Sequence, residues 1–348
     1  MADDEPIKGI RAENVTAWFE SNIPDVKPPL RFALITGGHS NLTYRVMDAA
    51  GNAFVLRRPP LGAVIATAHD MGREHKIIAA VGPTAVPVPS ALGLCQDESV
   101  NDAPFYVMDY VEGHVLTDVD LASRVLDEPA RSRLGEHVIE VLADLHAVDP
   151  DTIGLGDLGR KESYLARQIK RWRTQWEKTK TRELASMEEV AAALEAHMPE
   201  QIGASIVHGD YRLGNMLSLA EGKVAAVLDW ELCTLGDPLA DIGYIMNNWT
   251  EVGETGATAG GAAISPTACP GFPTRAEFLV RYTERTGRDV SKVSYYRAFQ
   301  YWRLAAIVEG VLSRYLKGVM GAAANTDAFQ AQVDALAASA VQMIQELD

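Results

Sequence analysis

Cysteine is scarce in this sequence, and the few cysteines are not spaced for a metal site or a disulfide framework. The three are Cys95, Cys233 and Cys269, in a chain of 348 residues. Their odd number and wide separation do not match zinc-site spacing and argue against a set of structural disulfides. Such usage is typical of a reducing compartment, so we expect a cytoplasmic location.

The sequence also lacks an excess of positive charge and lacks long apolar runs. Lys and Arg number 32 against 47 Asp and Glu, which gives a formal net charge of −15. So acidic a chain is a poor general binder of nucleic acid or of anionic membranes. No apolar run approaches the ~20 residues of a membrane-spanning helix, and the start, MADDEPIKGI, has no apolar signal segment. We therefore expect small-molecule partners, and neither nucleic acid nor a membrane.

What is present begins with a strand-rich segment. Apolar runs separated by Gly-containing turns predict five strands, and two helical patterns accompany them. The strands are expected at Arg31–Thr36, Thr43–Asp48, Ala53–Arg58, Ala91–Cys95 and Phe105–Tyr110, and the helices at Arg11–Glu20 and, with Asp70 as N-cap, at Asp70–Val81. This pattern predicts a small sheet-rich lobe with one main helix.

The remainder is mostly helical and contains a short β-rich island. Helices are predicted at Arg131–Ala147, Glu162–Lys178, Met187–His197, Asp237–Asn248, Thr274–Thr286, Val293–Lys317 and Thr326–Leu347. The strands of the island are predicted at Ser205–His208, Met216–Leu219 and Val224–Asp229. Residues 250–273 are rich in Gly, Ala, Thr and Pro, which predicts a mobile loop.

The strongest chemical signal lies in this island. The segment IVHGDYRLGNML places a polar loop between two apolar strands, and the loop carries His208, Asp210, Arg212 and Asn215. The next apolar strand, in VAAVLDWE, ends on the carboxylate of Asp229. Because strand ends lie at the rim of a sheet, a ligand can reach side chains placed there.

These residue types fit phosphoryl transfer, which needs metal ions on the phosphates, cations to offset charge, and a carboxylate to orient the attacking hydroxyl. Mg²⁺ prefers oxygen ligands and keeps several waters, so Asn215 and Asp229 suffice as its protein ligands. Asp210 then remains to accept the proton of the substrate hydroxyl.

At this point the sequence resembles a known family. His208-Gly-Asp210-x4-Asn215 resembles the kinase catalytic loop, and Asp229 resembles the metal-binding Asp of D-F-G. The H-G-D form and the following GDPLAD are similar to the aminoglycoside phosphotransferase family. Within that family, VLDWELCTLGDPLADIGY is closest to the branch of kinase-like domains attached to acyl-CoA dehydrogenases.

The resemblance implies a fold and an activity. It implies an α+β, bilobal, protein-kinase-like fold: an antiparallel nucleotide-binding lobe at residues 1–111 and a helical catalytic and substrate-binding lobe at residues 112–348. It also implies transfer of the γ-phosphoryl group of ATP, with Mg²⁺, to a hydroxyl of a small molecule; GTP remains an alternative. The acceptors considered are aminoglycosides, hydroxyacyl-CoA thioesters, and choline- or sugar-like alcohols.

Several residues in or near the loop are expected to have supporting roles, and for His208 this expectation comes from the same resemblance. His208 is expected to brace the loop rather than to react, and Asp237 and Asp241 to brace it and to cap a helix. Arg212 could steady the transferring phosphoryl group; the alternative is an ion pair with a neighbouring acid. His146 is expected to be a structural histidine.

In the first lobe, TGGHSNLTYRV resembles a phosphate-covering hairpin, with Ser40 and Asn41 near the nucleotide, although a plain hairpin turn would also give this pattern. FVLR resembles the V-A-I-K strand, with Arg57 where Lys is expected and Arg58 as an alternative. An Arg can pair with phosphate oxygens, but its fork differs from a point ammonium. Glu74 would then be the helix carboxylate that pairs with Arg57, unless it is a solvated surface residue.

PFYVMDYVEG resembles a kinase hinge, which would place Met108 beside the adenine and the backbone of Asp109 and Val111 at its edge. A buried edge strand is the alternative.

Two helical segments and one further function class stay open. The basic helix RQIKRWRTQWEKTK could bind an anionic substrate group such as a CoA phosphate, or it could simply pack Trp172 and Trp176; the segment YYRAFQYWRLAAIVEG could line the acceptor pocket or be core. The altered glycine loop and Arg57 also allow a pseudokinase that binds nucleotide without turnover.

Overall fold

The structure is a computed structural model that describes residues 7–35, 41–61, 70–254, 264–318 and 325–347. The chain divides into two compact units. The first contains residues 1–113 together with 225–231, and the second contains residues 114–224 and 232–348. Ser40, in the predicted phosphate-covering turn, lies outside the described residues.

The first unit is built on a five-stranded antiparallel sheet with the order β1-β2-β3-β5-β4. Its strands are β1 (Arg31–Leu34), β2 (Leu42–Met47), β3 (Ala53–Arg58), β4 (Ala91–Cys95) and β5 (Phe105–Asp109). All five predicted strands are confirmed: β3 and β4 have the predicted ends, and the ends of the other three differ by at most two residues. In register, Val55 of β3 lies opposite Met108 of β5, and Arg57 lies opposite Tyr106.

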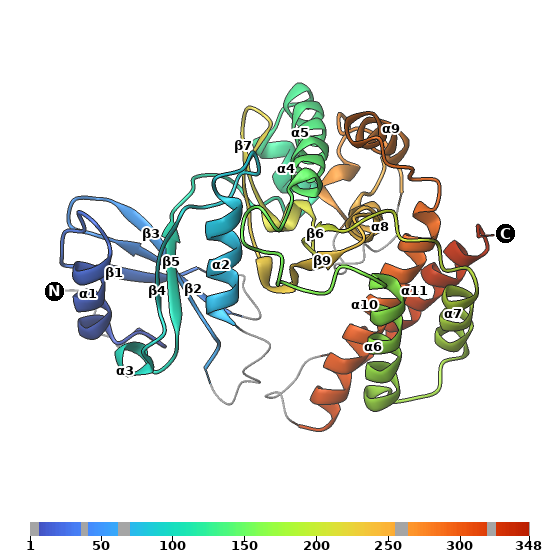
Figure 1. The fold of residues 1–348 in the computed structure, drawn as a ribbon, viewed down its shortest axis with the longest axis horizontal. Helices are drawn as coiled ribbons and strands as arrows, with labels where there is room; N and C mark the ends of the chain where they lie inside the picture. The colour runs from blue at the N-terminus through green and yellow to red at the C-terminus, as the bar shows by residue number, and fades with distance from the viewer. Residues whose placement is uncertain (1–6, 36–40, 62–69, 255–263, 319–324, 348) are drawn as a thin grey trace. The chain divides into compact units, whose positions relative to one another are not determined.

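One helix covers each face of this sheet (Figure 1). α1 (Ala12–Asn22) buries Val15 and Phe19 against alternate residues of the strands, among them Tyr44 and Leu56. The residues in between, such as Arg57, lie on the other face because successive strand side chains point in opposite directions. There they meet α2 (Met71–Val81).

The predicted N-cap of α2 is confirmed: the Asp70 side chain accepts a hydrogen bond from the Arg73 N–H at 2.9 Å. A short helix not predicted from the sequence, α3 (Glu98–Asn101), precedes β5.

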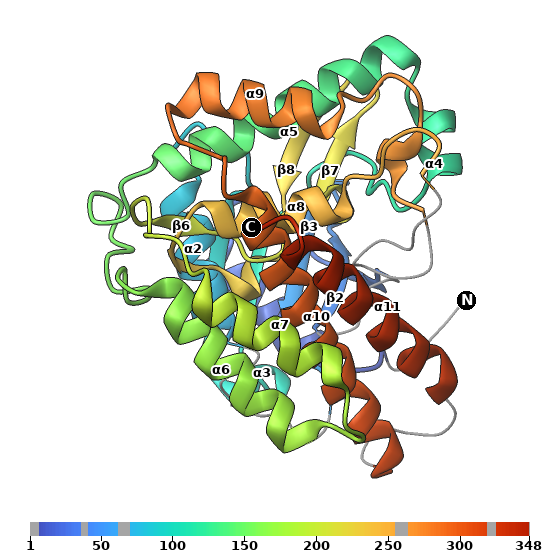
Figure 2. The ribbon, with the colours of Figure 1, turned by 90° about the vertical axis from the view of Figure 1, so that its right-hand side faces the viewer.

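The second unit is mostly helical, as predicted, and Figure 2 shows its long helices from the side. They are α5 (Glu128–Ala147), α6 (Tyr164–Thr179), α7 (Ala185–Ala196), α8 (Leu239–Asn248), α9 (Arg275–Thr286), α10 (Val293–Leu316) and α11 (Thr326–Ile344). α10 packs against α6, α8 and α11, and this places α10 at the centre of the unit. The seven-residue α4 (Val119–Val125) was not predicted.

The β-rich island contains β6 (Ser205–Val207), β7 (Met216–Leu219), β8 (Lys223–Val227) and β9 (Thr234–Gly236). β6 pairs with β9 in antiparallel fashion, and β9 was not predicted. β8 ends two residues before Asp229, so the prediction of a strand that reaches this carboxylate was wrong.

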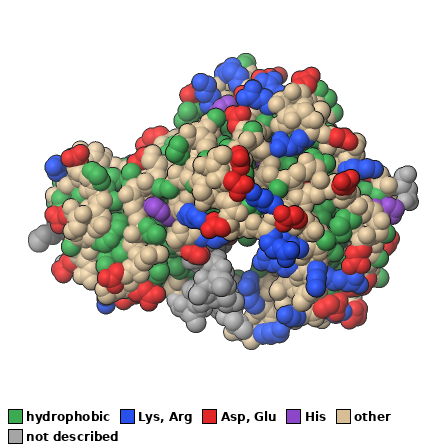
Figure 3. Space-filling model, in the orientation of Figure 1, with side chains coloured by type: hydrophobic (Ala, Val, Ile, Leu, Met, Phe, Trp, Pro, Cys, Tyr) green, Lys and Arg blue, Asp and Glu red, His purple; other side chains and the backbone are tan. Residues whose placement is uncertain are grey.

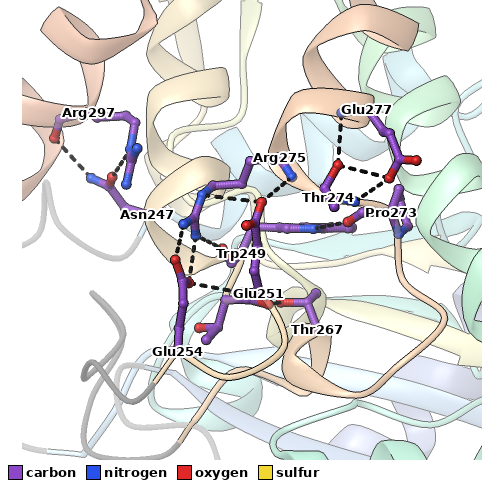
Figure 4. Close-up of polar contacts among 11 residues, drawn as sticks. Asn247, Trp249, Glu251, Glu254, Thr267, Pro273, Thr274, Arg275, Glu277 and Arg297 are labelled. Atoms are coloured by element: carbon purple, nitrogen blue, oxygen red, sulfur yellow. Dashed lines mark hydrogen bonds and ion pairs between the residues drawn. The ribbon is translucent and has the colours of Figure 1, made fainter.

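The described ends of segment 250–273 are tied to α9 (Figure 4). The backbone N–H of Arg275 donates to Glu251 Oε1 at 2.7 Å, and its guanidinium donates to the Trp249 carbonyl at 2.5 Å. The Trp249 ring N–H in turn donates to the Pro273 carbonyl at 2.7 Å. These contacts fix both ends of the segment, while the predicted mobility of its middle stays a prediction.

None of the helices in the described part of the chain has the length and apolar character needed to cross a lipid bilayer.

Candidate active site

The loop between β6 and β7, residues 208–215, is here called the catalytic loop, and it holds the carboxylate of Asp210 from both sides. The side-chain nitrogen of Asn215 donates to Asp210 Oδ2 at 2.6 Å and to the Asp210 carbonyl at 2.9 Å. Arg212 Nε lies 3.3 Å from Asp210 Oδ1. The structure thus brings these three predicted residues together. The bond geometry makes the amide nitrogen of Asn215 the donor, which leaves the amide oxygen for another partner.

The carboxylate of Asp241, on α8, fixes the backbone at the start of this loop. It accepts hydrogen bonds from the His208 N–H at 2.7 Å and from the Gly209 N–H at 2.8 Å. Gly209 has a φ of +84°, and a Cβ there would lie 2.9 Å from the Leu232 carbonyl oxygen, so glycine is required. The predicted bracing by Asp241 is confirmed.

His146 supports Asp241 from behind. Its Nε2 lies 3.3 Å from Asp241 Oδ2, and its Nδ1 lies 2.8 Å from the Tyr282 hydroxyl. Burial lowers the pKa of His146, although the hydrogen bond to Asp241 opposes this. Burial alone would raise the pKa of Asp241, but the hydrogen bonds that it accepts lower it. His146 is therefore the predicted structural histidine, and it acts through an anionic Asp241.

Of the two roles predicted for Asp237, helix capping is confirmed, whereas the described hydrogen bonds of its side chain run to α8 and α10 and not to the loop. One of its oxygens accepts from the Leu239 N–H at 3.0 Å, at the start of α8, and the other accepts from the Tyr296 hydroxyl of α10 at 2.8 Å.

Two residues near Asp210 were missed by sequence reasoning. Burial, then the charge of Asp210 and a hydrogen bond to its side chain, raise the pKa of the Tyr244 hydroxyl on α8. Arg303 of α10 is only 8% exposed and donates to the Gly209 carbonyl at 3.3 Å. The available signal was the polar pair Gln300 and Arg303, one turn apart in an otherwise apolar helix segment.

The first unit contains a second group, here called the arginine cluster: Arg57 of β3, Glu74 of α2 and Asp229. Arg57 Nη2 donates to Asp229 Oδ1 at 2.6 Å, and Arg57 Nε lies 3.2 Å from Glu74 Oε2. Glu74 is 2% exposed and also accepts from Asn41 Nδ2 and from the Tyr106 hydroxyl, both at 3.1 Å. The structure therefore gathers three of the predicted residues of the first lobe, Arg57, Glu74 and Asn41, together with the predicted metal ligand Asp229.

Electrostatics in the arginine cluster keep the guanidinium charged. Burial alone would lower the pKa of Arg57, but the neighbouring Tyr106, Glu74 and Asp229 raise it. Burial raises the pKa of Glu74, and the Arg57 charge opposes this. Glu74 is thus a buried carboxylate that depends on its cation.

Asp229 stands in an unusual backbone conformation. Its φ is +65°, in the left-handed region, which Asp tolerates better than most residues. The chain then turns into a 3₁₀ helix at Trp230–Leu232, and Glu231 lies 3.4 Å from the Asn41 amide nitrogen. A sharp turn after β8, rather than the strand itself, positions this carboxylate.

Arg58, the alternative to Arg57, faces the other side of the sheet. It is 4% exposed, and its Nη1 donates to the carbonyls of Gly9 at 2.6 Å and Asn101 at 3.1 Å. Its contacts are those of a buried structural residue, which leaves Arg57 as the arginine beside Glu74.

The predicted hinge residues lie at the end of β5. Met108 is buried within the strand, and the Asp109 N–H donates to the Ser90 carbonyl at 3.0 Å. Val111 follows the strand and is partly exposed. β5 lies between β3 and β4, so the alternative of an edge strand is wrong.

Among the described residues, no group of three or more His, Cys, Asp or Glu side chains is placed to hold a metal ion. The predicted magnesium ligands are one carboxylate and one amide oxygen, and phosphates and water would complete such a set.

Comparison with known proteins gives consistent matches. Residues 31–278, more than half of the chain, match the model of the phosphotransferase enzyme family. Acyl-CoA dehydrogenase family member 10 of Mus musculus is 34% identical over 292 residues, 83% of this chain and 27% of that protein. Family member 11 of Gallus gallus is 31% identical over 316 residues, 90% of this chain and 40% of that protein. The chain therefore spans less than half of the length of these relatives.

Solved structures agree with the family match. A candidate aminoglycoside phosphotransferase from Ralstonia eutropha has 32% identity and a TM-score of 0.82, over 96% of this chain and 98% of that one. Spectinomycin phosphotransferase APH(9)-Ia, solved with ADP and spectinomycin, has 13% identity and a TM-score of 0.57, over 98% of this chain and all of that one; this shows the fold alone. The fold is thus the predicted α+β kinase-like one, and the chain belongs to the phosphotransferase enzyme family.

Proposed function

We propose that this protein transfers the γ-phosphoryl group of ATP to a hydroxyl of a small molecule. The observation that carries the proposal is the Asp210 carboxylate, held by Asn215 and Arg212 on a loop whose backbone is fixed by Asp241. A carboxylate fixed in this way can orient the acceptor hydroxyl and accept its proton.

The arginine cluster supports a role in nucleotide binding for the first unit, residues 1–113 with 225–231. Arg57 is charged and is aimed by Glu74, so it can pair with phosphate oxygens when a nucleotide is present. Asn41 reaches the same carboxylate, and Ser40 is proposed to lie beside the phosphates. Met108, Asp109 and Val111 are proposed to contact the adenine.

Asn215 and Asp229 are the residues that would hold Mg²⁺. Their oxygens are the hard donors that this ion prefers, and the Asn215 amide oxygen is not used within the catalytic loop. When bound, the ion would offset the negative charge of the phosphates. Asp229 would exchange part of its contact with Arg57 for that ion.

ATP is the proposed donor, and GTP is the alternative. Among the structural neighbours, APH(9)-Ia was solved with ADP and aminoglycoside 2'-phosphotransferase-IIIa with GDP. Arg212 is proposed to steady the transferring phosphoryl group, and its contact with Asp210 places its charge at that carboxylate.

The proposed acceptor is a hydroxyacyl thioester or a related alcohol. The support is the match to acyl-CoA dehydrogenase family members 10 and 11. Aminoglycosides and other alcohols are the competing acceptors, and the cytoplasmic location stays a prediction.

A pseudokinase is the second candidate, and one contact favours it. Asp229 is the proposed metal ligand, and its Oδ1 accepts a hydrogen bond from Arg57 Nη2 at 2.6 Å. A nucleotide-binding scaffold could keep this ion pair permanently, whereas an enzyme would exchange part of this contact for the metal ion.

The test is Asp210→Asn in two assays. Mg²⁺-dependent thermal stabilisation by ATP should be the same in the variant and in wild type, because Asp210 does not hold the nucleotide. Nucleotide consumption, screened over a library of hydroxyl compounds, should fall by ~10²–10⁴-fold with the best acceptor.

Transfer at the wild-type rate by Asp210→Asn contradicts the mechanism. ATP stabilisation of wild type without transfer to any hydroxyl compound favours the scaffold instead.

A further inference from the structure

Arg303 is a buried cation without a buried anion beside it. Its Nη1 donates to Gln300 Oε1 at 2.8 Å and to the Gly209 carbonyl at 3.3 Å, and both acceptors are neutral. Within residues 7–35, 41–61, 70–254, 264–318 and 325–347, no carboxylate lies within ion-pair distance of this guanidinium. A buried charge normally requires a counter-charge, so this position is costly unless a ligand supplies one.

A second arginine lies on the same aromatic ring. The guanidinium of Arg303 is 5.6 Å from the centre of the Trp172 ring on α6, and that of Arg171 is 5.2 Å from it. Arg171 is exposed, and it too has no carboxylate partner in the part of the chain that the structure describes. By contrast Arg173, on the same helix, pairs with Glu188 and Glu195. In a chain of net charge −15, two guanidinium groups at one ring form a local positive site.

This positive site lies next to the catalytic loop. The carbonyl that Arg303 contacts belongs to Gly209, the residue before Asp210. In the space-filling view, Lys and Arg side chains gather over the lower part of the second unit, where α6 and α10 run (Figure 3). A molecule whose hydroxyl reaches Asp210 could therefore present a negative group to Arg303 and Arg171.

We propose that Arg303 and Arg171, placed around Trp172, bind an oxyanion of the phosphate acceptor. This inference rests on the proposed function, since it names the class of substrate for the same site. Two sources share this chemistry, the carboxylate of a free hydroxy acid and a phosphate of a carrier such as coenzyme A. Either would be selected over polycationic aminoglycosides, because two guanidinium groups repel cations.

The experiment measures anion binding directly. Wild type, Arg303→Gln, Arg303→Lys, Arg171→Gln and the matched control Arg173→Gln are titrated with coenzyme A, with 3-hydroxybutanoate and with its neutral methyl ester. Tryptophan fluorescence and thermal shift report binding, at low ionic strength because salt screens exposed charges. Circular dichroism and the melting temperature establish that each variant is folded.

Wild type should bind at least one of the two anions and should discriminate against the methyl ester. Affinity should fall by about ten- to hundred-fold in Arg303→Gln and by up to about ten-fold in the exposed Arg171→Gln. Arg303→Lys should keep part of it, and Arg173→Gln should bind as wild type does. Binding of coenzyme A alone assigns a carrier phosphate, and binding of 3-hydroxybutanoate assigns a carboxylate.

The proposal is overturned if wild type binds neither anion, if it binds the methyl ester equally well, or if both glutamine variants bind as wild type does. Even after such a result, the proposed function would hold if the protein transfers phosphate to a neutral alcohol and this transfer depends on Asp210. Unchanged transfer in Asp210→Asn would instead overturn that function, and the anion titrations would still decide the binding site.

Discussion

The arginine cluster holds Glu74 and Asp229 with one shared cation, whereas the catalytic loop holds Asp210 with hydrogen bonds from its own residues. The three members of the cluster come from β3, from α2 and from the turn after β8, far apart in the sequence. The three members of the loop lie within six residues, and Asp241 fixes the backbone that carries them. The cluster should therefore be sensitive to the loss of charge, and the loop to the loss of hydrogen-bond geometry.

The two groups are alike in how far water can reach their carboxylates. The side chain of Asp229 is 27% exposed and that of Asp210 is 19% exposed, so water or a ligand can reach both. Glu74 and Asp241 are buried almost completely. In each unit, a buried carboxylate supports an accessible one, which is the arrangement expected of a rigid site with a reachable reacting edge.

The largest effect should come from Arg57→Met, which removes the shared cation. Buried Glu74 would then lie beside Asp229 without compensation, and the free energy of unfolding should fall by about 3 kcal/mol, with only the buried Glu74 pair counted. ATP-induced stabilisation should be lost as well. Denaturant unfolding and thermal shift measure the two effects.

Arg57→Lys is the control for this change. It keeps the charge but loses the two-pronged geometry, so it should recover most of the stability and only part of the nucleotide response. If Arg57→Met were as stable as wild type, the positive charge of Arg57 would not be what stabilises the arginine cluster.

The next effect should come from Asp241→Asn, which tests the loop. An amide offers one acceptor oxygen, and its NH₂ group would face a backbone N–H, so one of the bonds from His208 and Gly209 is lost. The expected cost is about 2–3 kcal/mol of unfolding free energy. Phosphate transfer should also fall, measured at a temperature where the variant remains folded.

Asp237→Asn is the matched control, since this residue caps the start of α8 and contacts Tyr296 but none of the loop backbone bonds. It should lose some stability and keep most of the transfer rate. Equal losses of transfer in both variants would contradict a specific bracing role for Asp241.

How far apart in the sequence the residues of each group lie also decides how much of that group could be predicted. Asp210, Arg212 and Asn215 form a local motif, so their proximity was predictable. The choice of Arg57 over Arg58 was not, because adjacent strand residues face opposite sides and only packing decides which side meets α2. β9 was missed because its three residues form a strand only through their pairing with β6. In that pairing Leu235 lies opposite Ile206, which is 29 residues earlier in the chain.

Two further features depend on backbone and burial rather than on residue pattern. The positive φ of Asp229 belongs to a local turn, and the strand-like apolar run before it gave no indication of that turn. Arg303 lies in a helix for which the sequence left core and acceptor pocket both open. Its spacing from Gln300 places the two residues one turn apart, but nothing in the sequence indicates the contact with the Gly209 carbonyl.

A smaller effect should appear with pH, through His146 behind the loop. Its pKa is lowered in the folded protein, so below the unfolded value of about 6.5 the unfolded chain binds more protons. Stability should therefore be intact above about pH 6.5 and fall as the pH drops below it, by at most about 1.4 kcal/mol per pH unit for this group. Burial also lowers the pKa values of His75 and His137, which adds to the slope.

Denaturant unfolding at pH 7.5, 6.5 and 5.5 measures this slope. His146→Gln should be less stable at pH 7.5 and should show a shallower decline toward pH 5.5 than wild type. An unaltered slope in His146→Gln would show that this histidine is not the group that titrates.

The smallest effect should come from Asp70→Ala, which removes the cap of the helix that carries Glu74. The lost hydrogen bond to the Arg73 N–H should cost about 1 kcal/mol. Because Glu74 is the fourth residue of α2, fraying of the first turn would also loosen its contact with Arg57, so ATP-induced stabilisation should decrease, though less than in Arg57→Met. Asp70→Asn retains a capping oxygen and should behave nearly as wild type in both measurements. If Asp70→Ala lowers stability but leaves the nucleotide response intact, then Glu74 is positioned by its contacts with Tyr106 and Asn41 rather than by the helix start.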